Sequence, residues 1–443
     1  MLRLGDRATG EELGITPPLS GAEIEHNRER RVLGGRVRMA ALVVAAVCVA
    51  GAVAGGTLAV LRTPRAASTG GGAQDSLGSG TLASVLLRAE GATVRLVLGS
   101  QPSRSGWGSG TVISPTGLIL TNAHVAEPQA PGAAVALGVP ASQLESDPPY
   151  LTVDVTTGPA SPVKARYRAR PVAVDGYLDL AVVQIYATSS GAPVSPASLH
   201  LPYLPLGNDT QVQLDQPVTV LGFPGVADSD SITVTSGVVS TFVPDPLKHV
   251  GDPRFMLETT ARLAHGNSGG AAINNAGQLI GVPSLEVSGP GGDLSWRLRS
   301  VIEARPLIAA ATSRTAYHSR LLKQRTGSEQ ATAAGVGATA TEACSGNQSV
   351  TAGASAVFAA AYTQVPAGLD LALLVVLPNG TAVTVPTGGL PQAMAARSSG
   401  CFAITLAASQ LGLAALPGGT YHIQLYGGPN LTPIGQPVTI TLS

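Results

Sequence analysis

The sequence predicts an all-β protein in which a barrel region and a small β-sandwich follow one transmembrane helix. Short runs rich in β-branched residues begin at Thr93 and recur between Gly and Pro turns. This pattern is typical of antiparallel barrels rather than of alternating helices and strands. A second series of short strands with turn signals, between residues 349 and 442, predicts the sandwich. One uncharged apolar run at residues 39–61 predicts the helix.

Charge and composition limit the classes of partner. The 443 residues include 27 basic and 27 acidic side chains, and only 12% of residues are charged. Nucleic acids and acidic substrates select strongly basic surfaces, so we expect neither as a partner. No cysteine and histidine spacing matches a zinc site, and we expect no metal and no cofactor.

The first 82 residues divide into a tail, an anchor and a tether. Residues 1–38 are polar and predict a cytoplasmic tail. This tail contains a group of arginines, namely Arg28, Arg30, Arg31, Arg36 and Arg38. Residues 39–61 are long enough as a helix to span a membrane and predict an uncleaved signal anchor; a cleaved signal peptide or a buried soluble helix is the alternative. Because arginines are denser before the span than after it, the rest of the chain should lie outside the cytoplasm. Residues 62–82 predict a flexible linker.

Three segments carry side chains suited to nucleophilic catalysis. Residues 266–270 read GNSGG, and glycine allows a tight loop whose amides turn inward. Ser268 can then act as nucleophile while the amides of Gly266 and Ser268 bind an oxyanion. His124 follows an apolar run, and Asp179 begins another. Histidine can accept the proton of a serine near neutral pH, and a carboxylate can fix the tautomer of that histidine.

The order His124, Asp179, Ser268, in the segments TNAHV, DLAVV and GNSGG, resembles the trypsin-like serine peptidases, specifically the HtrA-type bacterial branch. Further matching segments are GSGTVI at 108–113, LGN at 206–208, GFPG at 222–225 and GQLIG at 277–281. The resemblance covers about residues 85 to 310. It implies a double six-stranded antiparallel β-barrel of the chymotrypsin type, a Ser-His-Asp triad and an acyl-enzyme. The chain departs from the HtrA pattern at Thr260 and at residues 271–272, and no PDZ-like pattern follows the barrels.

The same resemblance implies a substrate pocket. Its walls would come from residues just before the serine, and substrate backbone would lie along residues 294–297. The residues so implied are Arg262, Leu263, Ala264, His265, Ser295 and Trp296. Neighbouring side chains on an extended strand point in opposite directions, so only Arg262 or Leu263 can line the pocket fully. We predict Leu263, which suits an aliphatic side chain, and place His265 at the rim.

Two other parts of the peptidase region stand out. Between residues 127 and 170 the chain is longer and richer in proline than a minimal barrel needs. Within it, Lys164, Arg166, Arg168 and Arg170 alternate with other residues, which predicts a solvated edge strand protected by charge. Residues 301–325 have helical periodicity broken at Pro306, and we expect this helix to pack on the second barrel.

The predicted peptidase domain therefore covers residues 83–325, including that helix. A linker rich in Ala, Gly and Thr follows at residues 326–343, and a β-sandwich module at residues 344–443. Cys344 and Cys401 are the only cysteines of the module, since Cys48 lies in the anchor. A disulfide between them, worth about 3 kcal/mol, fits an oxidising compartment; two free buried thiols are the alternative.

Together these features predict a serine endopeptidase anchored in the cell membrane by one helix, with its peptidase domain extracytoplasmic and a protein or peptide as substrate. The alternative is a non-catalytic surface protein, in which the peptidase fold is a scaffold and the β-sandwich binds an unknown partner. An esterase with the same three groups is disfavoured, because the sequence lacks a strand-to-helix nucleophile elbow.

Overall fold

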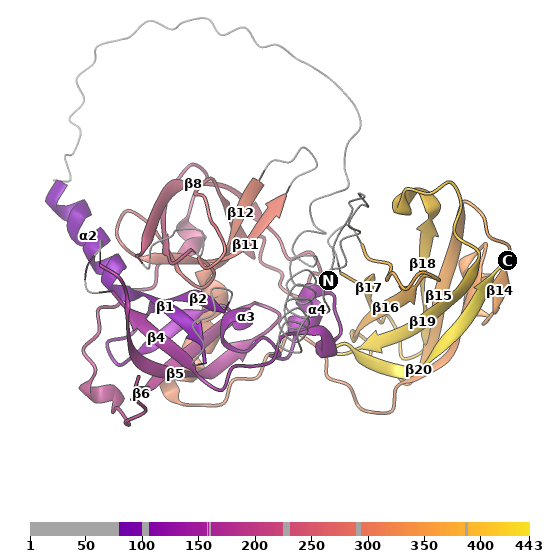
Figure 1. The fold of residues 1–443 in the computed structure, drawn as a ribbon, viewed down its shortest axis with the longest axis horizontal. Coiled ribbons are helices and arrows are strands. Elements are labelled where there is room, and N and C mark those ends of the chain that lie inside the picture. Colours follow the sequence, from indigo (N-terminus) through magenta and orange to yellow (C-terminus); the bar gives the residue numbers. More distant parts are fainter. Residues whose placement is uncertain are drawn as a thin grey trace, which may run out of the picture. The chain divides into compact units, whose positions relative to one another are not determined.

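The computed structural model describes residues 79–99, 106–156, 158, 161–224, 231–288, 294–385 and 389–443 (Figure 1). The predicted tail and anchor, and most of the predicted first linker, lie outside these residues. Among the helices in these ranges, none is both long enough and apolar enough to cross a membrane. The first described element is helix α2 (Ser79–Ala92), which occupies the end of the predicted linker and leads directly into the first strand.

Six strands after α2 form a closed antiparallel barrel. Their order around it is β1-β2-β3-β6-β5-β4. The strands are β1 (Thr93–Leu98), β2 (Trp107–Val112), β3 (Leu118–Thr121), β4 (Leu151–Val155), β5 (Lys164–Asp175) and β6 (Leu180–Thr188). The barrel closes over fully buried aliphatic side chains such as Ile119, Leu120 and Ile185. Alternation of buried and half-exposed positions along β6 is what the period of two in a strand requires.

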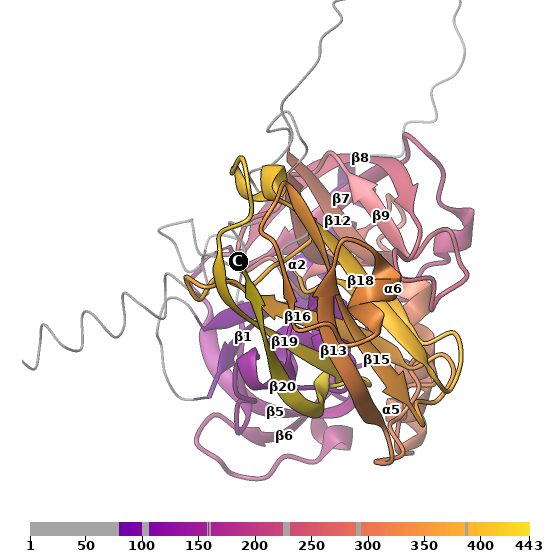
Figure 2. The same cartoon turned by 90° about the vertical axis from the view of Figure 1, so that its right-hand side faces the viewer.

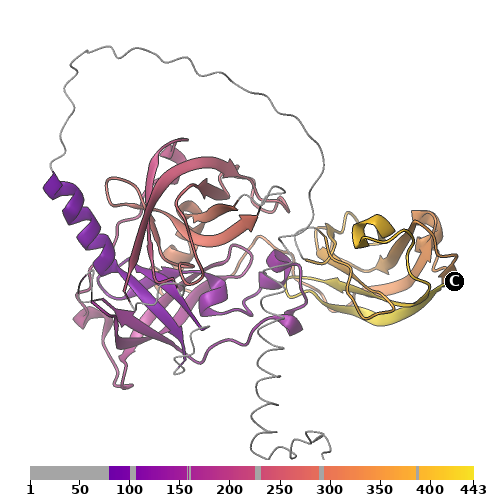
Figure 3. The ribbon, with the colours of Figure 1, turned by 45° about the horizontal axis from the view of Figure 1, so that its top comes forward.

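A second closed antiparallel barrel has the order β10-β11-β12-β9-β8-β7. Its strands are β7 (Pro217–Gly222), β8 (Thr233–Val243), β9 (Met256–Thr259), β10 (Ala271–Ile273), β11 (Leu279–Ser288) and β12 (Leu294–Ser300). The barrels lie side by side in Figures 1 and 3. Strand β7 of the second barrel contacts β1 and β2 of the first. Two closed six-stranded barrels confirm the predicted chymotrypsin-like fold.

The cationic strand differs from its prediction. It is β5, which pairs with β4 on one side and β6 on the other, so it is not an edge. Its charges are accommodated by aromatic side chains of neighbouring segments. The guanidinium of Arg168 lies 4.6 Å from the ring centre of Tyr150, and that of Arg170 lies 5.5 Å from Tyr186. Barrel closure, which the charge pattern alone does not reveal, explains the error.

The helix after the second barrel is shorter than expected and packs elsewhere. It is α5 (Arg305–Ser313), and Pro306 lies in its first turn, where the missing N–H costs nothing. Pro306 therefore helps to begin the helix and does not break it. Helix α5 buries Leu307 and Ala311, and its main contacts with strands are with β5 and β6 of the first barrel.

The remaining chain forms two sheets around one core (Figure 2). One sheet has three strands in the order β13-β15-β18 and the other has five in the order β14-β20-β19-β16-β17. The elements are β13 (Gln330–Gly337), α6 (Ala340–Cys344), β14 (Ser349–Val350), β15 (Ser355–Thr363), β16 (Asp370–Val376), β17 (Gln392–Met394), β18 (Gly400–Ala407), β19 (Gly419–Gly427) and β20 (Thr432–Leu442). Phe358 and Tyr421 meet between the sheets with ring centres 5.3 Å apart.

Strand β13 lies in the segment that composition assigned to a linker. Its small residues serve close packing against α6. A Cβ atom on Gly335 would lie 2.7 Å from the carbonyl oxygen of Ala343, and one on Gly337 would lie 2.5 Å from Cβ of Glu342. Low complexity here therefore reflects a tight helix–strand contact rather than a tether.

The predicted disulfide between Cys344 and Cys401 is present. The two Cα atoms are 6.0 Å apart, and the residues are separated by 57 positions. The bond joins α6 to β18 across the three-stranded sheet.

Candidate active site

His124 and Asp179 meet at the ends of adjacent strands of the first barrel. His124 lies in the short helix α3 (Ala123–Ala126), which follows β3, and Asp179 directly precedes β6. The Nδ1 atom of His124 is 2.9 Å from Oδ1 of Asp179 and 3.0 Å from Oδ2. The backbone N–H of His124 also donates to Oδ1, at 3.0 Å. The Asp179 carboxylate thus binds both the ring and the backbone of His124. The backbone of Asp179 has a φ of 53°, which Asp tolerates better than most residues.

Two further side chains support this carboxylate. Ser284 Oγ donates to Oδ2 of Asp179 at 2.6 Å. Asn122 Nδ2 donates to the backbone carbonyl of Asp179 at 2.8 Å and to Ser284 Oγ at 3.1 Å. Ser284 is not among the site residues that were predicted from the sequence. Its signal is weak, since it is only the first polar residue after the buried run at the start of β11, and its partner is remote in sequence.

Charge and hydrogen bonding set the protonation states of the pair. Burial raises the pKa of the Asp179 carboxyl, but the charge and hydrogen bond of His124, with the bonds from Ser284 and the His124 amide, bring that pKa below its usual range. Burial lowers the pKa of His124, but the charge and hydrogen bond of Asp179 and the charge of Glu145 raise it overall above 6.5. The His124 side chain is 43% exposed, so solvent screens part of this effect. Its open side leaves the other ring nitrogen within reach of solvent or substrate.

The loop that carries Ser268 rests against the first barrel. Ser109 of β2 donates its N–H to the Ser268 carbonyl at 2.7 Å and its hydroxyl to the Gly266 carbonyl at 2.6 Å. A side chain on Gly269, whose φ is 84°, would collide with Thr121 at the end of β3. Only glycine fits this contact. The contact places the serine loop beside the strand that leads to His124.

The two amides predicted for oxyanion binding are unoccupied by protein partners. Among the described residues, neither Gly266 N–H nor Ser268 N–H donates a hydrogen bond. Their neighbours differ, since Asn267 N–H donates to Ala264 at 3.0 Å and Gly269 N–H to Pro283 at 2.9 Å. No hydrogen bond joins Ser268 Oγ to His124 within the described structure, and such bonds often tighten only when substrate binds.

The predicted pocket residues have different environments. Leu263 is half-buried against the core of the second barrel, whereas Arg262 and His265 are exposed. Ala264 and Ser295 are half-buried, as is Trp296, whose Nε1 is buried without a partner in the described part of the chain.

The strand predicted to hold substrate has little free edge. From Trp296 to Arg299, β12 pairs with β11 on one side and β9 on the other. Strand β11 pairs with β10 only as far as Gly281, and in the described residues no strand continues beyond that point on this side. Among the described residues, the strand edge beside the serine loop that has no partner strand is therefore the part of β11 from Ser284 onward.

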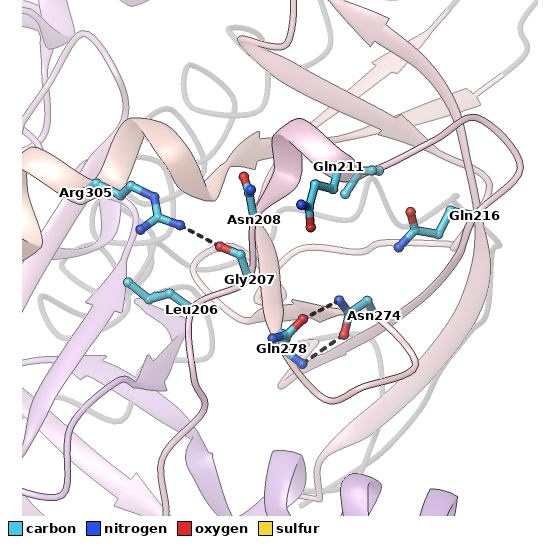
Figure 4. A pocket seen from close by; sticks show the side chains of 9 residues that line it. Leu206, Gly207, Asn208, Gln211, Gln216, Asn274, Gln278 and Arg305 are labelled. Atoms are coloured by element: carbon cyan, nitrogen blue, oxygen red, sulfur yellow. Dashed lines mark hydrogen bonds between the residues drawn. The ribbon is translucent and has the colours of Figure 1, made fainter. Parts of the chain in front are cut away.

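A polar cavity lies elsewhere on the second barrel. It has a volume of about 340 Å³, and Arg305 donates to the Gly207 carbonyl at its edge (Figure 4). Its lining consists of Leu206, Gly207, Asn208, Gln211, Val212, Gln216, Asn274, Gln278 and Arg305. None of the predicted site residues takes part in it.

Comparisons with known proteins agree with this geometry. A family model described as "Trypsin-like peptidase domain" matches residues 108–282. A "Probable periplasmic serine endoprotease DegP-like" of Chlamydia pneumoniae is 31% identical over 185 residues, which are 42% of this chain and 30% of the relative. "Serine protease HTRA2, mitochondrial" of Bos taurus is 31% identical over 184 residues, 41% of this chain and 32% of the relative. "Serine protease HTRA4" of Mus musculus is 31% identical over 196 residues, 44% of this chain and 33% of the relative.

This chain spans about a third of the length of these relatives. The matched residues include His124, Asp179 and Ser268. The chain therefore carries a trypsin-like peptidase domain that is similar to the HtrA-type serine peptidases.

Proposed function

We propose that this protein is a membrane-anchored serine endopeptidase that hydrolyses peptide bonds outside the cytoplasm. The observation that carries the proposal is the His124–Asp179 pair, joined by hydrogen bonds of 2.9 and 3.0 Å, beside a serine loop whose Gly266 and Ser268 amides have no hydrogen-bond partner among the described residues. The match of residues 108–282 to a trypsin-like peptidase domain supports it.

In this mechanism Ser268 Oγ attacks the carbonyl carbon of the peptide bond while His124 Nε2 accepts the hydroxyl proton. Asp179 holds Nδ1–H, which fixes the tautomer and stabilises the imidazolium. The amides of Gly266 and Ser268 bind the oxyanion, and each contributes about 3 kcal/mol to transition-state stabilisation. The C–N bond then breaks as His124 returns the proton to the leaving amine. Water, activated by His124, releases the acyl group from Ser268.

The substrate backbone adds as an extended strand to the part of β11 that has no partner strand among the described residues. Main-chain hydrogen bonds of this kind give affinity without regard to sequence. This placement replaces residues 294–297, which the resemblance implied, because β12 is paired on both sides from Trp296 onward. Leu263, half-buried beside the serine loop, supplies an apolar pocket wall.

A non-catalytic scaffold remains the second candidate. The observation that favours it is that no hydrogen bond links Ser268 Oγ to His124 among the described residues. A scaffold would retain the fold but show no reaction that depends on Ser268.

We further propose that residues 39–61 anchor the chain with its amino terminus in the cytoplasm. The uncharged run and the arginines before it support this orientation. The disulfide between Cys344 and Cys401 also supports it, since such bonds persist in oxidising compartments.

Replacing Ser268 by Ala should abolish labelling by a fluorophosphonate and all cleavage of an unstructured protein such as casein, because the nucleophile is removed. Ser190→Ala, at an exposed serine of the first barrel, is the matched control and should label like the wild type. Equal labelling of the wild type and Ser268→Ala would contradict the assignment and favour the scaffold.

The labelling rate should fall as pH drops through the pKa of His124, because only the neutral imidazole accepts a proton. That pKa is raised, so the midpoint of the wild-type profile should lie above pH 6.5. Asp179→Asn removes the raising charge, moves the midpoint to lower pH and slows the maximal rate about 10⁴-fold. Asp215→Asn, at an exposed aspartate, should leave the profile unchanged. Coinciding midpoints in wild type and Asp179→Asn would exclude Asp179 as the partner of His124.

Leu263→Ala should lower kcat/KM about tenfold for peptides with a medium-sized aliphatic residue at the cleavage point. A lost methylene contact in an apolar pocket costs about 1–3 kcal/mol of transition-state binding, and a tenfold loss lies at the lower end of this range. Arg262→Ala should leave this preference intact. A peptide library that shows an acidic preference abolished by Arg262→Ala would instead assign the pocket to Arg262.

Thiol trapping in intact cells should show an oxidised module. Alkylation of the denatured, unreduced chain should modify one cysteine, Cys48, and prior reduction should expose all three cysteines of the chain. Cys344→Ser/Cys401→Ser gives the same pattern with and without reductant and serves as control. Alkylation of three cysteines before reduction would argue against an extracytoplasmic module.

A further inference from the structure

The carboxy-terminal module, residues 344–443, packs against the chain segment that follows His124. We call this contact surface the seat of the module. This segment, residues 127–150, is the first part of the long proline-rich stretch noted in the sequence at residues 127–170, and it contains helix α4 (Ala133–Leu137). We call residues 127–150 the insertion. Four hydrogen bonds join it to the module: Gly132 N–H to Pro429 O at 3.2 Å, Ala141 N–H to Asn430 O at 3.1 Å, Leu390 N–H to Gly138 O at 2.7 Å, and Gln392 Nε2 to Val135 O at 3.0 Å. The insertion therefore has a defined partner.

The seat is tightly packed and apolar at its centre. Leu390 and Leu431 of the module are buried in the same cluster as Val135 and the first-barrel core. At Gly138 and Gly389 the two backbones touch, since a Cβ atom on Gly138 would lie 2.8 Å from Cα of Gly389. Because the two backbones are in direct contact, the insertion is held in one position relative to the module.

A buried hydrogen bond between a histidine and a carboxylate makes the second contact between the module and the peptidase domain. Nε2 of His249, in the β8–β9 loop, is 2.8 Å from Oδ1 of Asp370 at the start of β16, and each side chain is only 5% exposed. Asp245 shapes this loop by accepting the N–H groups of Leu247 and Val250, at 3.1 and 2.8 Å. A buried pair of this kind contributes little net stability but penalises any arrangement that separates its members.

The insertion and the loop of His249 both contact the turn that precedes Asp179, which contains Gly176 and Tyr177. Tyr177 donates its hydroxyl to Asp245, and its ring meets that of His249 edge-on at 4.9 Å. Gly176 N–H donates to Pro131 O at 3.1 Å. A Cβ atom on Gly176 would lie 2.5 Å from atoms of the insertion, so the turn and the insertion fit without spare room.

We propose, on the basis of the function proposed above, that the carboxy-terminal module is a positioning element for the His124–Asp179 pair. It holds the insertion that follows His124 and, through His249 and Tyr177, the turn that precedes Asp179. Proton transfer is sensitive to displacements of about 1 Å, so a support on both segments bears directly on the rate. Asp370 and His249 are positioning residues, because neither touches the reacting groups.

Asp370→Asn in the full chain tests the proposal, because it removes the charge at constant shape. Two readouts are needed: the titration of His124, followed by NMR of histidine labelled with ¹³C at Cε1, and kcat and KM on a peptide substrate. The pKa of His124 should fall toward 6.5 as its contact with Asp179 loosens, and kcat should fall about tenfold with little change in KM, as for typical coupling between sites. Asp215→Asn is the matched control.

A rescue variant separates positioning from mere packing. His249→Phe/Asp370→Leu replaces the buried pair by apolar groups of similar size, which is often tolerated in protein interiors. It should restore the His124 titration and kcat toward wild-type values. His422→Asn, at an exposed histidine of the module, should change neither. If Asp370→Asn does not fold, Gln392→Ala offers a second test. It removes the hydrogen bond from Gln392 to Val135 and keeps the contact between His249 and Asp370. It should lower the His124 pKa and kcat in the same direction but by less.

The outcomes distinguish the two proposals. Asp370→Asn or Gln392→Ala with a lower melting temperature but an unchanged His124 titration and kcat would overturn the positioning role. A wild-type protein that hydrolyses nothing would overturn the proposed function, while the His124 titration, which needs no turnover, would still decide whether the module positions the pair.

Discussion

The arrangement of the site depends on one buried serine, Ser109, at the seam between the barrels. Every polar atom of this residue has a partner: its N–H and hydroxyl donate to carbonyls of the serine loop, its carbonyl accepts from Thr121 at 2.7 Å, and its hydroxyl accepts the N–H of Phe223 at 2.9 Å. Ser109 is fully buried, so losing any of these partners would leave an unsatisfied polar group. The strand leading to His124, the end of β7 and the loop of Ser268 are thereby fixed to one point.

The hydrogen bonds to the Asp179 carboxylate depend on this fixed arrangement of the two barrels. Asp179 receives hydrogen bonds from His124 and from Ser284, which belong to different barrels. Its carboxylate is therefore stabilised across the seam as well as within its own barrel. A pair of this kind keeps its geometry only while the barrels keep theirs, which ties protonation of the histidine to the packing of the whole domain.

Spaced sequence motifs, through the family that they resemble, predicted the two closed barrels, and the structure brings two of the three predicted triad side chains, His124 and Asp179, into contact. The roles of Ser109 and Ser284 could not be predicted from local sequence, because a serine in a strand acquires such a role only from partners that are remote in sequence. Composition misled for a related reason. The Ala- and Gly-rich segment assigned to a linker forms β13, because small residues suit both flexible tethers and close contacts. The charges of β5 indicated an edge, but closure of the barrel is a property of all its strands.

The seat of the module has a consequence for the timing of synthesis. His124 is translated about 265 residues before Gly389, one of the residues of the module that abut the insertion. At roughly 5–20 residues per second, the ribosome needs between about 13 and 53 s to cover that distance. A nascent peptidase that depends on this support would stay immature until its final sheets emerge. Delayed maturation of this sort would spare neighbouring nascent chains from premature cleavage.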